Sequence, residues 1–171
     1  TAGSSQFKAE ALVDGTDWTD EIHDAVPESI KNRWNEVINF VLNSTDEEFK
    51  ANLGNYFDVQ SLIDYYLFGI VSCNYDGFNK NQLYLTYDGM KWFASVYDLD
   101  LTWGISDDGS SIIDYDTMWY MEYDWNKLYC RIDSLFIQEL CERWKELRTT
   151  VFDVGNIINH FERFTDICPP W

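Results

Sequence analysis

Hydrophobic positions in residues 25–43 recur every three or four residues, which predicts an amphipathic helix with Pro27 in its first turn. Ser44 followed three residues later by Glu47 is a capping-box pattern, so we expect a second, short helix that Gly54 would end. The apolar positions of the first helix are Ile30, Trp34, Val37, Ile38, Val41 and Leu42.

The strongest helical pattern covers residues 59–73, and Asp58 is placed to cap this helix. Its apolar positions form one continuous face over three turns. The helix is expected to end where the polar sequence NYDGFNKN, residues 74–81, begins. The apolar positions are Val59, Leu62, Ile63, Tyr66, Leu67, Ile70 and Val71.

After this helix the pattern changes to that of strands. Residues 82–97 contain two aromatic and β-branched runs, and Asp88-Gly89 between them is typical of a two-residue type I′ turn. We therefore expect a β-hairpin whose second strand runs straight into Asp98 and Asp100. The following polar segment, residues 104–124, has no clear period and predicts a long irregular connection.

The rest of the chain predicts two helices, over about residues 125–148 and 153–167, the second ended by Pro169-Pro170. Residues 1–29 are expected to be loosely ordered. A chain of 171 residues suits one compact domain. The predicted fold class is α+β, mostly α, with a central β-hairpin packed against helices.

Charge narrows the possible partners. The formal net charge is −18, and such a field repels nucleic-acid phosphates and anionic membranes. No apolar run approaches the roughly 20 residues that span a bilayer. We therefore expect no nucleic-acid binding and no membrane insertion.

The cysteines and histidines show no catalytic or metal-binding pattern. The four cysteines lack zinc-ligand spacing and leave the redox compartment open. Cys130 and Cys141, on one predicted helix, would lie roughly 16 Å apart, beyond disulfide reach. His23 and His160 are isolated, which favours structural roles.

Candidate chemistry lies in residues 74–104. Asp76 and Asn81 stand in the spacing D-x-x-x-x-N, where phosphoryl transfer uses the Asp to orient the attacking hydroxyl and the Asn to hold a metal ion. Asp98 or Asp100 after the hairpin would supply the second metal contact, and such oxygen ligands suit Mg²⁺ or Mn²⁺. An Asp and an Asn in a loop also serve as turn residues, so it is the ordered set that favours this chemistry.

This part of the chain resembles the core of the spore-coat protein H (CotH) kinase family. That family's pattern runs from a helix containing DYY through N-x-D-G, an Asn and a hairpin to D-x-D-x-T-x-G. With the flanking helices, the similarity covers roughly residues 30 to 166. The matching positions are Asn74, Asp76, Gly77, Asn81, Asp98, Asp100, Thr102 and Gly104.

The resemblance implies a kinase-like C-lobe over residues 30–171, a piece of a larger protein that uses ATP and Mg²⁺ or Mn²⁺ to phosphorylate protein Ser or Thr. Asp76 would be the catalytic-loop Asp, and Asn81 a metal or loop-ordering partner. Asp98 or Asp100 would bind the metal, with Asp98 favoured as the first carboxylate after the strand. The remaining motif residues, Asn74, Gly77, Thr102 and Gly104, would order the backbone.

Two departures from ordinary kinases weaken the expected activity. Asn74-Tyr75 replaces the usual His-Arg pair, and no Gly-rich phosphate loop or strand Lys with a partner Glu is visible. Lys8 lies too near the terminus to fill that role, so the nucleotide-binding residues stay unknown. This piece alone is expected to bind nucleotide weakly and to turn over poorly or not at all.

The alternative is a non-catalytic structural or interaction module of a coat, cell-surface or phage virion protein. Those locations are favoured over the cytoplasm in either case. A glycosidase pair at Asp98 and Asp100 is disfavoured, since most of the eight Trp lie on helical apolar faces. A calcium loop starting at Asp98 fails because Trp103 and Gly109 occupy the positions that need Gly and Glu.

Overall fold

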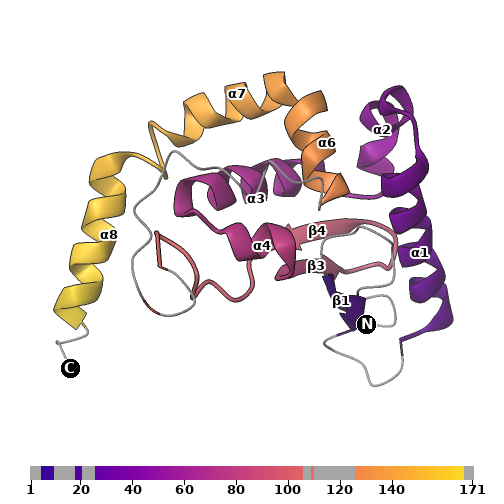
Figure 1. Cartoon of the computed structure of the whole chain (residues 1–171), viewed down its shortest axis with the longest axis horizontal. Coiled ribbons are helices and arrows are strands. Elements are labelled where there is room, and N and C mark those ends of the chain that lie inside the picture. The colour runs from indigo at the N-terminus through magenta and orange to yellow at the C-terminus, as the bar shows by residue number, and fades with distance from the viewer. Residues whose placement is uncertain (1–4, 10–17, 21–25, 106–108, 110–125, 168–171) are drawn as a thin grey trace. The chain divides into compact units, whose positions relative to one another are not determined.

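The computed structural model describes residues 5–9, 18–20, 26–105, 109 and 126–167. It divides into two compact units, Thr1–Ile137 and Gln138–Trp171, and each is described by itself. The helices and strands of the first unit are β1 (Ser5–Ala9), β2 (Trp18–Asp20), α1 (Glu28–Asn43), α2 (Asp46–Asn52), the 3₁₀ helix η1 (Leu53–Asn55), α3 (Val59–Ser72), α4 (Tyr75–Asn79), β3 (Gln82–Thr86), β4 (Trp92–Ser95) and α6 (Lys127–Leu135) (Figure 1).

The second unit consists mainly of α7 (Ile137–Leu147), which begins at the unit boundary, and α8 (Val154–Ile167). Within this unit the ring of Trp144 lies 6.2 Å from that of Phe152. The expected α+β, mostly α class is confirmed, as is the terminal helix. The expected stop at Pro169-Pro170 lies outside the described residues. Across the described part of the chain, we find no helix with the length and apolar character needed to span a membrane.

The strands form one antiparallel sheet in the order β2-β1-β3-β4, in which Phe7 of β1 pairs with Tyr84 of β3. The sequence pattern does not predict β1 or β2. Because β1 and β2 are short and β1 pairs with a strand far along the chain, local periodicity carries little signal for them. Phe7 is fully buried, and its ring stacks 4.8 Å from that of Trp92.

Helix α1 covers the sheet with Trp34. Its buried indole lies 4.6 Å from the Trp92 ring and 5.4 Å from the Tyr84 ring, centroid to centroid. Burying rings of this size makes a large contribution to the free energy of folding. The apolar face predicted for residues 25–43 is therefore the face that forms the core.

The hairpin is confirmed, but its turn is not the expected two-residue type I′ turn. Thr86 pairs with Trp92, so residues 87–91 form a longer loop. The Asp88 carboxylate accepts hydrogen bonds from the backbone N–H groups of Met90 (2.8 Å) and Lys91 (3.1 Å), and these bonds lower the pKa of Asp88. The aspartate thus organises a wider turn through its own side chain.

The outer edge of β4 is paired with residues 56–58, the segment just before α3. The Trp92 N–H donates to the Tyr56 carbonyl, and the Trp92 carbonyl accepts from the Asp58 N–H, both at 2.8 Å. Asp58 caps α3 as predicted, because its carboxylate accepts from the Ser61 N–H at 2.8 Å. These bonds attach α3 to the hairpin and therefore place the polar segment that follows α3.

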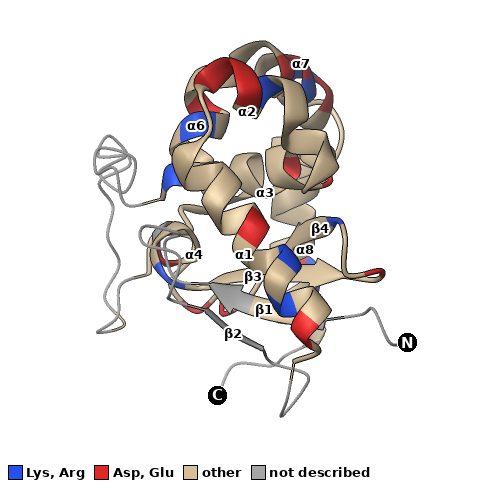
Figure 2. Ribbon diagram, turned by 90° about the vertical axis from the view of Figure 1, so that its right-hand side faces the viewer, with Lys and Arg blue, Asp and Glu red and all other residues tan. Residues whose placement is uncertain are grey.

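The predicted N-cap of α2 is wrong by one residue. Thr45 and Glu48 form the capping box, whereas the Ser44 N–H and hydroxyl both donate to the Phe40 carbonyl and so complete α1. Gly54 does not end the helix, because the chain continues through it as η1. The first turn of α2 carries Asp46, Glu47 and Glu48, visible as the red part of that helix in Figure 2.

The helix predicted over residues 125–148 is two helices, α6 and α7, which separate at Phe136 (φ −112°, ψ 26°). Phe136 is buried edge-on against Phe49, at 6.3 Å between centroids, and the Lys50 ammonium binds the Leu135 carbonyl at 2.6 Å. Tertiary contacts therefore break a continuous helical pattern. Cys130 and Cys141 consequently lie on different helices, and both carry free thiols.

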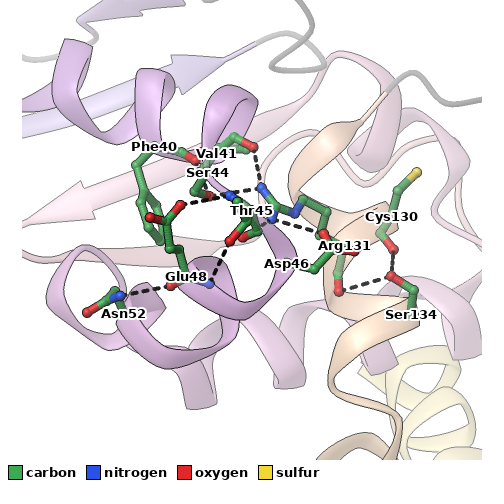
Figure 3. A network of polar contacts seen from close by, with 10 residues as sticks. All are labelled: Phe40, Val41, Ser44, Thr45, Asp46, Glu48, Asn52, Cys130, Arg131 and Ser134. Atoms are coloured by element: carbon green, nitrogen blue, oxygen red, sulfur yellow. Dashed lines mark hydrogen bonds and ion pairs between the residues drawn. The ribbon is translucent and has the colours of Figure 1, made fainter.

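Arg131 of α6 binds the junction between α1 and α2 (Figure 3). Its guanidinium donates to the carbonyls of Val41 (3.0 Å) and Thr45 (2.7 Å) and to the Ser44 hydroxyl (3.0 Å). It also lies 4.0 Å from the centre of the Phe49 ring. One side chain thereby satisfies backbone carbonyls where one helix ends and the next begins.

Candidate functional site

The polar segment expected as a loop contains the short helix α4. The Asn74 side chain caps it by accepting from the Gly77 N–H at 3.1 Å. At its other end the backbone N–H groups of Lys80 and Asn81 both donate to the Asp76 carbonyl, at 2.9 and 3.0 Å. The six residues from Asp76 to Asn81 are therefore held in one compact turn.

The chain reverses between α3 and α4 at Cys73, whose left-handed backbone (φ 54°, ψ 40°) ends α3. The Asn74 N–H then donates to the Gly69 carbonyl at 2.8 Å. Burial raises the pKa of the Cys73 thiol. The reversal brings the first turn of α4 back alongside α3.

Phe78 anchors α4 to the core through its buried ring. Its ring is 1% exposed and packs edge-on against Tyr65 (5.9 Å), Tyr66 (5.9 Å) and Tyr129 (5.1 Å). Gly69 of α3 leaves the space for this ring, since a Cβ there would lie 2.4 Å from it. Sequence reasoning missed these positioning residues. The available signal was one aromatic residue inside an otherwise polar segment.

Backbone carbonyls of α4 are held by side chains from three other elements. The Tyr65 hydroxyl donates to the Gly77 carbonyl at 2.8 Å, and the Phe78 carbonyl accepts from Asn126 (2.9 Å) and Gln82 (3.3 Å). Burial, and next the charge of Asp76, raise the pKa of Tyr65. Tyr65 therefore keeps its proton and remains a hydrogen-bond donor.

Asn81 joins two of the predicted carboxylates. Its side-chain Nδ2 donates to Oδ2 of Asp76 and, at 3.3 Å, to Oδ2 of Asp98. Asn81 is 1% exposed and Asp76 7% exposed, whereas Asp98 is exposed to solvent. The Lys80 ammonium lies 3.8 Å from Asp76 Oδ2. The structure thus brings Asp76, Lys80, Asn81 and Asp98 together.

The sequence predicted that the second strand of the hairpin runs straight into Asp98, and this prediction is wrong. Strand β4 ends at Ser95, and Asp98 has a left-handed backbone with φ 52°. That conformation turns the chain out of the extended direction. Within the part of the chain that the structure describes, the Asn81 amide binds Asp98, and Asp100 lies exposed in the turn beyond it.

Thr102 and Gly104 lie where the chain returns to α3. The Thr102 hydroxyl donates to the Leu99 carbonyl at 2.6 Å, and the Trp103 N–H donates to the Ser72 carbonyl at 2.5 Å. Trp103 and Gly104 both have positive φ, 57° and 81°. This tight return ties the segment containing Asp98 to the end of α3.

The donor set suits a hard divalent cation. The carboxylates of Asp76 and Asp98 and the amide of Asn81 offer oxygen atoms, which Mg²⁺ and Mn²⁺ prefer. Among the described residues no group of three or more His, Cys, Asp or Glu side chains gathers to hold a metal.

Lys8, which the sequence analysis did not assign to nucleotide binding, lies on β1 opposite Leu83.

Replacing Gly77 by Ala is expected to lower the free energy of unfolding by about 1–3 kcal/mol. A Cβ at Gly77 would lie 2.4 Å from Asn74 Nδ2 and 2.7 Å from the Tyr65 hydroxyl oxygen, so the cap or the anchor must shift. Urea denaturation measures the change. Gly54→Ala is the matched control, because its Cβ meets nothing closer than 4.0 Å. Equal stabilities of the two variants would contradict the steric explanation.

Comparison with known proteins supports the pattern seen in the sequence. A family model described as CotH kinase protein matches residues 6–168. The match begins within β1, so it includes the sheet strands that precede α1 as well as the site. A search of curated proteins found no match.

Proposed function

Because this chain belongs to the CotH kinase protein family, we propose that its site transfers a phosphoryl group from ATP to the hydroxyl of a protein Ser or Thr, with Mg²⁺ or Mn²⁺. One observation carries the proposal. The Asn81 amide holds the carboxylates of Asp76 and Asp98 in one site, although Asp98 lies on the far side of the hairpin in sequence. Phosphoryl transfer needs these residue types together.

In this proposal Asp76 accepts the hydroxyl proton. Its carboxylate is mostly buried but reaches solvent on one side, with 10% of the side chain exposed. The hydrogen bond from Asn81 orients this carboxylate, to which the substrate hydroxyl would pass its proton. Proton transfer to Asp76 accompanies formation of the bond between the hydroxyl oxygen and the γ-phosphorus, and ADP leaves with the electron pair of the broken bond.

Asp98 and Asn81 are the residues that would hold the divalent ion. When bound, the ion neutralises phosphate oxygens and so lowers the cost of the charge that develops during transfer. Asp98 is exposed and can reach a ligand without rearrangement of the core. Asn81 is buried and its amide nitrogen donates to both carboxylates, so it sets the spacing between the proton acceptor and the metal-binding carboxylate.

Thermal unfolding with and without ATP plus Mg²⁺ tests this proposal. A ligand that binds only the folded state stabilises it by about 2.7 kcal/mol at one hundred times its dissociation constant. We expect a metal-dependent rise in the unfolding midpoint that Asp98→Ala removes and Asp100→Ala retains. The Asn81 contact with Asp98 is the reason for that difference.

Two outcomes would contradict the assignment. Loss of the shift in Asp100→Ala alone would transfer the metal-binding role to Asp100. An unchanged midpoint in the unsubstituted chain, at millimolar ATP with either metal, would instead favour a structural or interaction module that has the fold without the chemistry.

A further inference from the structure

Phosphoryl transfer brings a strongly negative group to a site that is itself acidic. Two carboxylates meet at Asn81, and the chain carries a net charge of −18. Positive charge close to the transferred group is therefore the contribution that this site most needs beyond the metal ion. Lys80 is the basic side chain that the structure places against Asp76.

The backbone of Lys80 is held in place by a hydrogen bond, whereas its side-chain ammonium is exposed. Its backbone N–H donates to the Asp76 carbonyl at 2.9 Å, which holds the residue at the end of α4. The side chain is 57% exposed, and Nζ lies 3.8 Å from Asp76 Oδ2. This distance exceeds that of a hydrogen bond, so attraction between charges alone holds the ammonium there.

An exposed pair of this kind contributes little to stability, typically about 0–1 kcal/mol. Reorienting the ammonium toward another anion consequently costs little. Lysine has a flexible four-carbon stem and three N–H donors. It can therefore follow a moving phosphate oxygen better than the rigid, planar guanidinium of arginine could. The Lys80 side chain is far more exposed than that of Asp76, so an incoming anion can reach the ammonium from solvent.

We propose that Lys80 binds the terminal phosphate of the nucleotide and remains on it during transfer, an inference that rests on the proposed function. The hydroxyl proton passes to Asp76 as the new oxygen–phosphorus bond forms and the bond to the ADP oxygen breaks. Protonation removes the negative charge of Asp76, and with it the attraction that held Lys80. The ammonium then offsets negative charge on the phosphoryl oxygens while the transfer is completed.

Binding of a triphosphate and a diphosphate distinguishes this role from a general effect of charge. The ¹⁵N-labelled chain is titrated with a non-hydrolysable ATP analogue and with ADP, each with Mg²⁺, following the amide signals of Gly77 and Asn81. For Lys80→Ala we expect the dissociation constant of the triphosphate to rise about tenfold, a loss of ~1.4 kcal/mol, and that of ADP to change less than about twofold. For Lys80→Arg we expect a triphosphate dissociation constant between those of the unsubstituted chain and Lys80→Ala.

Lys91→Ala is the matched control, because it removes the same charge from an exposed position in the hairpin loop. It should leave both dissociation constants within about twofold. Equal losses for triphosphate and ADP in Lys80→Ala, or no loss for either, would overturn the role of Lys80 and leave the proposed function standing. Absence of binding to the unsubstituted chain would overturn both.

Discussion

The exchange Asp76→Asn is expected to abolish measurable phosphoryl transfer while the fold is retained. A positioned general base contributes about 10²- to 10⁴-fold to the rate, and Asn cannot accept the hydroxyl proton. Asn has nearly the same shape, and its side-chain oxygen can still accept from Asn81. The rate is measured as transfer of labelled γ-phosphate to a Ser- and Thr-containing protein, or to the chain itself.

Asp64→Asn is the control for this exchange. Asp64 lies on α3 and accepts from Gln60 at 3.0 Å, so the exchange removes one negative charge from the same unit at a residue outside α4. It should leave the rate unchanged. Transfer by Asp76→Asn at the unsubstituted rate would show that the proton acceptor is another group, or that the transfer does not depend on this site.

A second large effect is expected for Arg131→Met, a loss of about 2–4 kcal/mol in the free energy of unfolding. The Arg131 side chain is only 14% exposed, and its guanidinium satisfies the carbonyls of Val41 and Thr45. Methionine keeps much of the apolar stem but removes the guanidinium donors, so that the Thr45 carbonyl retains only the Phe49 N–H. Urea denaturation followed by circular dichroism measures the change.

Arg131→Lys tests the same contacts more narrowly. Lysine retains the charge but cannot reproduce the planar fork, so we expect most of the loss to remain. Lys31→Met, at an exposed position of α1, controls for the removal of a positive charge. A loss in Lys31→Met as large as in Arg131→Met would mean that charge, and not the junction of α1, α2 and α6, accounts for the effect.

The contact between Asp76 and Asn81 could be predicted because it joins two residue types at close spacing in the sequence. Asp76 and Asn81 lie on either end of one short segment, so their proximity is nearly guaranteed by the covalent chain. The choice between Asp98 and Asp100 could not be made from spacing. It depends on the left-handed backbone at Asp98 and on the contact with Asn81 across the hairpin.

The contacts that hold α4 in place could not be predicted from local sequence patterns either. Phe78 reads as one aromatic residue in a polar segment, and Gly69 as a small residue in an apolar helix. Their roles appear only when α3 and α4 pack, since Gly69 provides the space that Phe78 fills. The same holds for Asn126, whose amide reaches the Phe78 carbonyl from a distant part of the sequence.

By itself the sequence determined the helices α1, α3 and α8, the β3–β4 hairpin and the proximity of Asp76 and Asn81. Each depends on periodicity or on spacing within a few residues, where the chain geometry leaves few alternatives. Tertiary structure decided the pairing of β1 with β3, the break at Phe136 and which aspartate meets Asn81. These features arise from contacts between residues far apart in the chain, whose free energies no local pattern records.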